Sequence, residues 1–241
     1  MATALLSAII VSAQIVETVT GFGATVIALA LGVHLVPLDV LVVALVLIGI
    51  GQSAWLVARG FSHVAWRTLL VRVLPACAAG MAAGRWLFDR LGTGRLKLVL
   101  GLFVAVVAAV ELVRLFRKPA PPAKLPAPAG IALLLGGGVF HGLFASGGPL
   151  VVYFMSREVG DKRAFRATLS VLWLVLNTVL LATWIPGGRI GPEPLRLAAV
   201  MLPSLIVGVA IGEIVHSRVN EDVFRKTVQV VLLATGIVLL T

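Results

Sequence analysis

The sequence predicts an all-α membrane protein with about eight transmembrane helices, built as two repeats of four helices. Three observations support this prediction: the chain is poor in charge, its apolar segments are long and continuous, and its two halves are similar. Of its 241 residues, 60% are hydrophobic and 12% are charged, and the mean hydropathy is +1.09. Soluble domains carry about 25% charged residues, so much of this surface has to face lipid.

Eight apolar segments approach or exceed the roughly 20 residues that a helix needs to cross the hydrocarbon core. They are continuous runs without the alternation of a β-barrel strand, which favours helices. The first ten residues carry no Lys or Arg, so we expect the first segment to be a retained helix and not a cleaved signal peptide. The segments are approximately Thr3–Leu35, Leu38–Ala58, Thr68–Phe88, Leu96–Leu115, Ala129–Met155, Ala164–Ile185, Leu195–Val215 and Val223–Leu240.

The formal net charge of +10 comes from basic residues scattered between the apolar segments. Such residues anchor loops at a membrane surface, whereas a nucleic-acid-binding protein gathers them on a soluble face. We therefore expect a multi-pass protein of the cell (plasma or inner) membrane that has the lipid bilayer as its partner and binds no nucleic acid. Cys77 is the single cysteine, which excludes an internal disulfide.

A proline-rich stretch, Arg117–Pro128, separates the two halves of the chain. Proline at this density cannot continue a helix, so we expect residues 117–128 to form an extended linker. The linker leaves an N-terminal four-helix repeat at residues 1–116 and a C-terminal four-helix repeat at residues 129–241.

The repeat is visible as residue types that recur at a nearly fixed spacing. The spacing is 128 positions in the third and seventh segments and 125 positions in the earlier ones. Duplicated units commonly build transporters, with the substrate between them near the bilayer midplane. The recurring pairs include Gly80 with Gly208, Gly84 with Gly212, Gly23 with Gly148, and Gln52 with Asn177. The two Gly-xxx-Gly pairs are typical of helices that pack closely on a neighbour.

Two of the apolar segments are too long for one simple crossing. Thr3–Leu35 would measure about 50 Å as a straight helix, and Ala129–Met155 is similarly long. Eight simple crossings favour parallel repeats with both termini outside, because basic clusters follow the third and seventh segments. If the two long segments are re-entrant hairpins instead, each half crosses an odd number of times and the repeats are inverted.

Both long segments contain a glycine-rich interruption at membrane depth, within residues 17–25 and within residues 141–149. Glycine weakens a helix and Pro149 cannot donate to the preceding turn, so each helix is expected to break there. The half-helix that follows presents free N–H groups and a partial positive charge, which together bind anions. Close helix packing or a simple kink would also explain the glycines. The candidate substrate-binding residues are Thr20, Gly21, Phe22, Gly23, Ala24, Thr25, Ser146, Gly147 and Gly148.

Other polar residues lie within the apolar segments near these breaks. Glu17 shares a helix face with Gln14 and is a candidate for proton coupling, although it could also sit at a wet surface or pair with an arginine. His141 could couple protons or make one structural hydrogen bond. Gln52 and Asn177 could line the anion site or bond between helices.

Enzyme signatures are lacking in the sequence. There is no HExxH, paired-cysteine metal site, P-loop or dinucleotide-binding glycine motif. Ser146 lies in a stretch that superficially suggests an intramembrane serine protease, but Phe144 stands where that motif has glycine. We therefore expect no catalytic residues, no cofactor and no metal.

The chain resembles the TauE/SafE family of sulfite exporters and sulfonate permeases along nearly its whole length. The resemblance implies a permease with duplicated four-helix halves that moves sulfite or related organosulfur anions. It is carried by an ordered set of features: Gly21-Phe22-Gly23, the short loop through Pro37, the Pro75/Gly80/Gly84 helix, the proline-bearing linker, the second glycine break, Arg166-Ala167-Thr168-Leu169-Ser170 and Asn177.

The sequence therefore predicts a secondary transporter of small anions, with sulfite or organosulfonates as the substrate, bound between the two repeats. The alternatives are a passive anion channel and an intramembrane enzyme or assembly factor without transport. A homodimer, the direction of transport and the coupling ion stay open.

Overall fold

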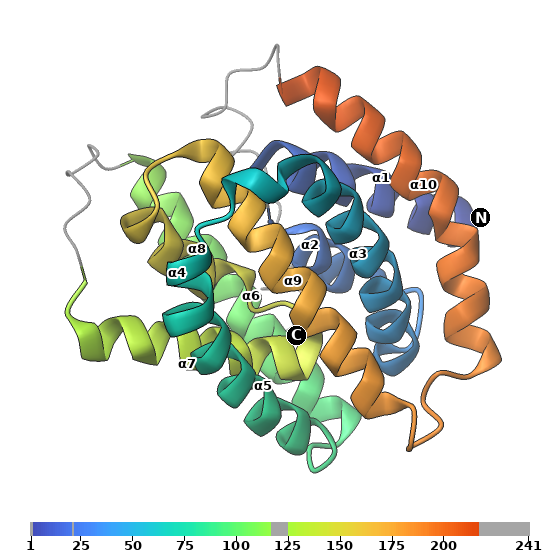
Figure 1. The fold of residues 1–241 in the computed structure, drawn as a ribbon. Helices are drawn as coiled ribbons and strands as arrows, with labels where there is room; N and C mark the ends of the chain where they lie inside the picture. Colours follow the sequence, from blue (N-terminus) through green and yellow to red (C-terminus); the bar gives the residue numbers. More distant parts are fainter. Residues whose placement is uncertain (1, 21, 117–124, 217–241) are drawn as a thin grey trace. The chain divides into compact units, whose positions relative to one another are not determined.

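The computed structural model describes residues 2–20, 22–116 and 125–216, and this part of the chain is helical with no β-strand (Figure 1). A 3₁₀ turn η1 (Phe61–His63), the short α4 (Trp66–Thr68) and a π-helical turn η2 (Leu69–Val73) join α3 to α5. The longer helices are α1 (Ala2–Thr20), α2 (Ala24–Gly32), α3 (Leu38–Gly60), α5 (Leu74–Phe88), α6 (Thr93–Phe116), α7 (Ala127–Phe144), α8 (Gly148–Glu158), α9 (Lys162–Trp184) and α10 (Pro192–His216).

The first seven predicted segments fall on these helices, and the two long ones are each divided in two. The eighth, Val223–Leu240, lies outside the described residues, as does most of the predicted linker, so the count of eight helices stays a prediction. Four described helices are long and apolar enough to cross a membrane: Leu38–His63, Ala127–Phe144, Arg163–Trp184 and Pro192–Val215.

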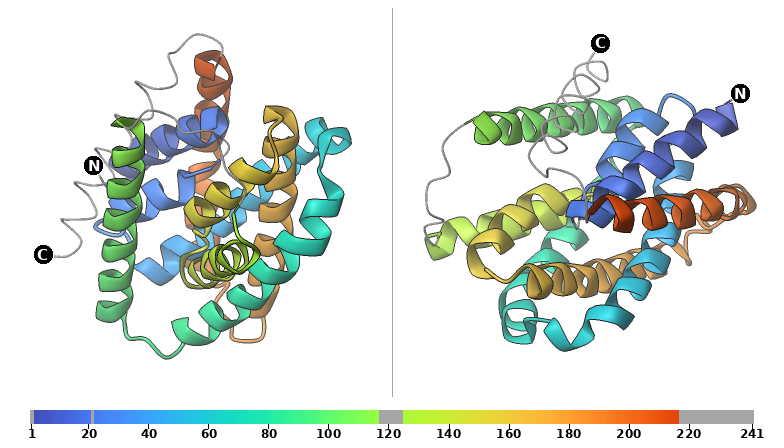
Figure 2. Two further views of the ribbon diagram at one scale, coloured as in Figure 1. Left: turned by 90° about the vertical axis from the view of Figure 1, so that its left-hand side faces the viewer. Right: turned by 90° about the horizontal axis from the view of Figure 1, so that it is seen from above.

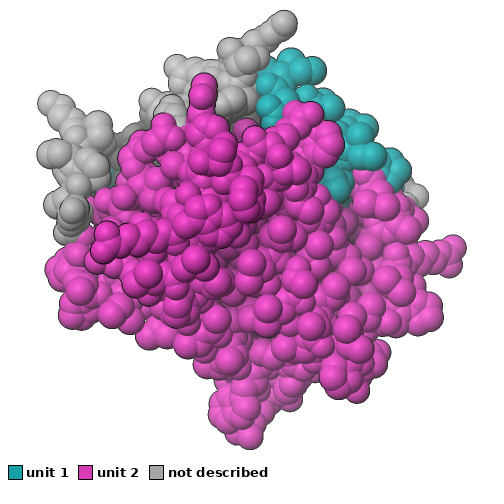
Figure 3. Space-filling model, viewed as in Figure 1, with its two compact units in different colours: residues 1–38, 91–121, 203–241 teal, residues 39–90, 122–202 magenta. Residues whose placement is uncertain are grey.

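The helices group into two compact units, which Figure 3 colours separately. Unit 1 contains Met1–Leu38, Leu91–Pro121 and Pro203–Thr241, and unit 2 contains Asp39–Arg90 and Pro122–Leu202. Each unit draws helices from both sides of the linker, so a unit is not the same as a predicted repeat.

In unit 2, α5 and α7 lie side by side and are joined through glycines on both helices (Figures 1 and 2). A Cβ atom at Gly80 would overlap the carbonyl of Leu135, and one at Gly84 would overlap the carbonyl of Val139. Gly142 on α7 is pressed in the same way against the backbone of α5. The prediction that the Gly80-xxx-Gly84 pair serves close helix packing is confirmed.

In unit 1, the second glycine pair has the same use. A Cβ at Gly208 of α10 would lie 2.6 Å from Cβ of Gln14, and a Cβ at Gly212 would lie 2.6 Å from Cβ of Thr18. Since both contacts are far inside van der Waals distance, α10 can pack this closely on α1 only with glycine at these positions. Each glycine pair therefore lets its helix pack closely on the helix that precedes a break, which is α7 in unit 2 and α1 in unit 1.

The chain enters α5 through a π-helical turn, η2, that precedes Pro75. Proline has no N–H and its ring clashes with the carbonyl four residues earlier, which in a regular helix would be that of Val71. The wider π turn spans this residue, so the helix continues across the proline. The result is one nearly continuous helical path from Trp66 to Phe88.

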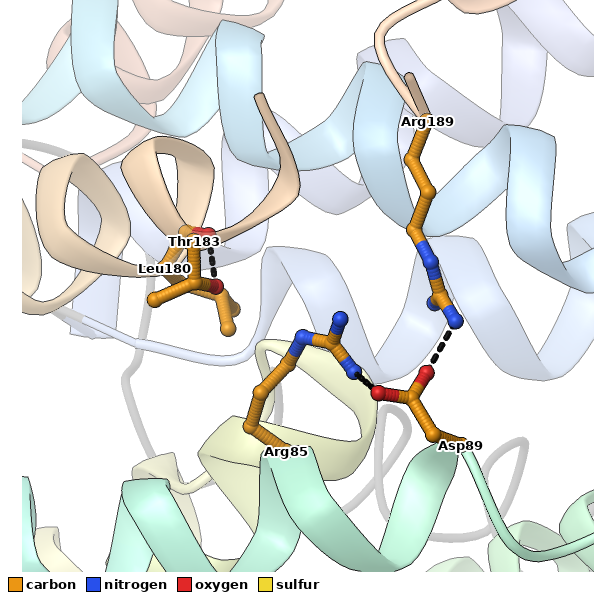
Figure 4. A network of polar contacts seen from close by, with 5 residues as sticks. All are labelled: Arg85, Asp89, Leu180, Thr183 and Arg189. Atoms are coloured by element: carbon orange, nitrogen blue, oxygen red, sulfur yellow. Dashed lines mark hydrogen bonds and ion pairs between the residues drawn. The ribbon is translucent and has the colours of Figure 1, made fainter. Parts of the chain in front are cut away.

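The far end of α5 is tied to the loop after α9 by charged side chains (Figure 4). Asp89 accepts from Arg85, one turn earlier on the same helix, and from Arg189 in the loop. The Arg189 guanidinium also lies 5.0 Å from the ring centroid of Phe88. Arg85 therefore has a carboxylate partner within unit 2.

The two helices α7 and α8 form an antiparallel hairpin in unit 2. A Cβ at Gly130, near the start of α7, would lie 2.8 Å from the Phe154 ring near the end of α8. Deeper in the hairpin, a Cβ at Gly137 would lie 2.7 Å from Val151. Of the arrangements that the sequence left open for residues 129–155, the structure has the hairpin, because the chain turns back at the break.

The hairpin has a consequence for the predicted topology. The 11 residues of α8 rise about 16 Å, which is half of the roughly 30 Å hydrocarbon core. The break thus lies near mid-depth if Glu158, which pairs with Arg72 at 3.1 Å, marks the membrane surface. If the first long segment is a hairpin as well, each half crosses an odd number of times and the repeats are inverted.

Cysteine labelling is expected to place both ends of the hairpin on one side of the membrane. The end of α3 meets the start of α9, since Ala65 N–H donates to Thr168 Oγ1 at 2.9 Å. From there the 23 residues of α9 rise about 35 Å to the opposite side. In a Cys77→Ala background, a membrane-impermeant thiol reagent should modify Ser62→Cys and Gly160→Cys from one side and Gly187→Cys from the other. Modification of all three from the same side would contradict this topology.

Candidate anion site at the second helix break

The break between α7 and α8 has an unusual backbone. Ala145 ends α7 in the left-handed conformation, with φ 52° and ψ 29°, and its N–H donates to the His141 carbonyl at 2.7 Å. Such a cap is normally a glycine, because a Cβ in this region costs about 1–2 kcal/mol. Strain of this kind clusters at functional sites, where the surroundings hold the backbone in place.

Gly147, the N-cap of α8, fixes how the hairpin closes. A Cβ at this position would overlap the carbonyl of Gly137 and would lie 3.1 Å from Cβ of His141. Glycine therefore allows the first turn of α8 to press against the middle of α7, directly beside His141.

The first turn of α8 keeps unused hydrogen-bond donors. Pro149 has no N–H, and Val151 N–H bonds to the Gly147 carbonyl at 3.4 Å. The N–H groups of Gly148 and Leu150 donate to no other residue that the structure describes. No side chain caps this end of the helix. These two donors and the partial positive charge of the helix end are the elements of an anion site.

Three buried side chains beside this helix end also have unused polar atoms. His141 is 1% exposed and stacks on Trp173 with ring centroids 5.5 Å apart. Asn177 lies near enough to the His141 ring for a weak hydrogen bond, but neither imidazole nitrogen nor Asn177 Oδ1 makes a hydrogen bond of good geometry with a described residue. The hydroxyl of Ser146, 3% exposed, is also unpartnered there. A buried polar group without a partner costs about 1–3 kcal/mol, so a cluster of them points to a ligand or ordered water.

Gln52 extends this polar cluster onto α3. A Cβ at Gly49 would lie 3.1 Å from Asn177 Nδ2, so this face of α3 is turned toward α9. Gln52 lies one helical turn later on the same face, is 4% exposed, and has no described partner for Nε2. The predicted residues Gln52, His141, Ser146 and Asn177 thus all belong to unit 2 and face neighbouring helices of it.

The first break, in unit 1, is arranged differently. Gly23 has φ 107°, and the Ala24 N–H at the start of α2 donates to Glu17 Oε2 at 2.9 Å. The donor that was expected to hold substrate is therefore already bound to a carboxylate of the chain. Phe22 and Thr25 are half-buried, whereas Gly21 and the side chain of Thr20 lie outside the described residues.

Helix boundaries show how the two breaks correspond. Helix α1 ends 124 positions before α7 ends, at Thr20 and Phe144, and α2 begins 124 positions before α8 begins. The sequence analysis aligned the breaks at a spacing of 125, and the two-repeat layout stays a prediction. With the observed spacing Gly147 corresponds to Gly23, and His141 corresponds to Glu17.

Two residues of the site were not predicted from the sequence. Trp173 forms the stacking surface for His141, and Ala145 carries the left-handed turn. The only signal for Trp173 was its position one turn before Asn177 on α9. An alanine gives no signal for a left-handed cap.

The comparison with known proteins agrees with this membrane architecture. The chain matches the family described as "Sulfite exporter TauE/SafE" over residues 6–239. It is 28% identical to the "Probable inner membrane transporter protein TsaS" of Comamonas testosteroni over 182 residues, 73% of each chain. It is 25% identical to the "Probable sulfite/organosulfonate exporter TauE" of Cupriavidus necator over 232 residues, 91% of this chain and 86% of that one.

No solved structure matches the chain. The family match covers almost every residue, including both helix breaks and both glycine pairs. Together with several apolar helices of membrane-crossing length, it identifies a multi-pass integral membrane protein. The chain belongs to the TauE/SafE family of membrane transporters.

Proposed function

We propose that the chain is a secondary transporter of a small oxyanion, with sulfite or an organosulfonate as the substrate class, in the cell inner membrane. One observation carries the proposal: the uncapped start of α8 lies beside His141 and Ser146, whose buried ring nitrogens and hydroxyl make no hydrogen bond of good geometry with a described residue. The printed names of the two relatives, an inner membrane transporter and a sulfite/organosulfonate exporter, support the location and the substrate class.

The chemistry of the break suits such an anion. The N–H groups of Gly148 and Leu150 donate to its oxygens, and the dipole of α8 stabilises its charge. The Ser146 hydroxyl, a ring N–H of His141 and the Nδ2 amide group of Asn177 donate to further oxygens. These donors are neutral, so no buried lysine or arginine has to be desolvated, and binding stays weak enough for release. The sequence has no nucleotide-binding motif, so an ion gradient or the substrate gradient supplies the energy.

Removing the Asn177 amide is expected to lower sulfite uptake into reconstituted vesicles by about tenfold or more, since a lost buried hydrogen bond costs about 1–3 kcal/mol. Asn177→Leu is the test variant. Thr178→Val is the matched control, because Thr178 is the next residue on α9, is exposed, and bonds only to the Leu174 carbonyl of its own helix. Saturable uptake with counterflow distinguishes a carrier from a passive channel. Absence of flux for sulfite and every sulfonate tried, with folded protein, would refute the proposal.

A further inference from the structure

We propose that Glu17 is a tethered anion that occupies the start of α2, so that only the second of the two helix breaks is open to a free anion. This inference rests on the proposed function, since it concerns how many anion sites the transporter offers.

The two breaks are built alike. Each follows a helix that is packed through a glycine pair, with Gly212 against Thr18 in unit 1 and Gly84 against Gly142 in unit 2. Thr18 and Gly142 are 124 positions apart, which is the same spacing as the helix ends. Glu17 directly precedes Thr18 in the first unit, and His141 directly precedes Gly142 in the second.

The equivalent donors have different partners in the two breaks. At the first break, the N–H of Ala24 donates to Glu17 Oε2 at 2.9 Å. At the second break, the corresponding N–H belongs to Gly148 and donates to no described residue. His141 stands in the place of Glu17, and both of its ring nitrogens are unpartnered among the described residues. At the first break, Ala24 N–H thus has a carboxyl group of the chain as its acceptor, although the next two N–H groups, of Thr25 and Val26, donate to no described residue. The second break has the equivalent donor at Gly148 and no carboxyl group beside it.

The carboxylate of Glu17 is a chemical counterpart of the proposed substrate. Like a sulfite or sulfonate group, it presents oxygens that share a negative charge and accept from backbone N–H groups. While it occupies the start of α2, a second anion at that helix end would find the Ala24 N–H already bound and, whenever Glu17 is ionised, would also meet a like charge. The identity of a single residue therefore decides whether a break is closed or open.

This assignment predicts that a carboxylate can be moved to close the second break. His141→Glu places an acidic side chain beside the α8 donors at the position that Glu17 has beside α2. His141→Gln is the matched control, because it has the same length and shape as glutamate and no charge. Glu17→Ala removes the tethered anion from the first break.

Binding of radiolabelled sulfite to the purified full-length protein in detergent tests the inference. The wild type is expected to bind one sulfite per chain. His141→Glu should weaken binding by about 100-fold or more, as like charges placed together cost several kcal/mol, whereas His141→Gln should retain measurable binding. Glu17→Ala should raise the stoichiometry to two. If this variant does not fold, Glu17→Gln replaces it, since glutamine keeps the length of the side chain and removes its charge; the expected stoichiometry is again two.

The outcomes separate this inference from the proposed function. One site in the wild type that stays one site in folded Glu17→Ala would overturn the tethered anion and leave the transporter proposal intact. Two sites in the wild type would also overturn it. No sulfite binding and no flux by the folded wild type would overturn both.

Discussion

Gly147→Ala is expected to abolish sulfite transport. The added Cβ would overlap the carbonyl of Gly137 and press on His141, so the first turn of α8 has to move away from α7. The clash is with backbone, which cannot turn aside as a side chain can. Displacing an anion-binding group by about 1 Å can cost on the order of a hundredfold in rate. Uptake of sulfite into vesicles, normalised to the folded protein, is the measurement.

The control for this variant is Gly160→Ala. Gly160 lies between α8 and α9, and a Cβ there would meet no atom within 4 Å. The same glycine-to-alanine change should therefore leave transport close to the wild-type rate. If Gly147→Ala also transports at that rate, the hairpin does not have to close tightly for the anion to be carried.

Local sequence was sufficient to locate both helix breaks. Glycine and proline at Gly23, Gly147 and Pro149 disfavour a continuous helix whatever surrounds them, and the structure ends and restarts its helices there. The close-packing role of Gly80 and Gly84 was also readable, since a Gly-xxx-Gly pair on one helix face has few other uses in a membrane.

The direction of the chain after a break could not be predicted from the sequence. Ala129–Met155 is as compatible with a tilted crossing as with a hairpin, because both bury the same apolar residues. The hairpin is established by the contacts of Gly130 with Phe154 and of Gly137 with Val151. These contacts join residues that are far apart in the sequence, so local sequence does not reveal them. The spacing of the two breaks could not be fixed to the residue for a related reason, since the neighbouring glycines Gly147 and Gly148 align equally well with Gly23.

The role of Glu17 also depended on the structure. Intramembrane carboxylates usually face a cavity, which made Glu17 a candidate for proton coupling. The sequence gives no sign that the side chain reaches across the break to the N–H of Ala24, seven residues later. That contact exists only because the chain turns at Gly23, whose φ of 107° brings the start of α2 back toward the end of α1.

Gly84→Ala is expected to destabilise the protein by about 3 kcal/mol or more, since forcing atoms into a packed interface costs about 1–3 kcal/mol and backbone cannot yield. The new Cβ would overlap the carbonyl of Val139 and push α5 and α7 apart. For a chain of this size the loss corresponds to a fall in Tm of roughly 6–12 °C. Thermal unfolding in detergent, followed by tryptophan fluorescence, measures it.

Ala83→Leu is the control, because Ala83 is the preceding residue of α5 and is exposed. It adds three carbon atoms where Gly84→Ala adds one, yet its Tm should stay close to that of the wild type. A larger fall for Ala83→Leu would mean that side-chain volume on α5, and not the backbone contact at Gly84, limits stability. The prediction bears on transport as well, since α7 carries His141 and any shift of α7 displaces the imidazole from the start of α8.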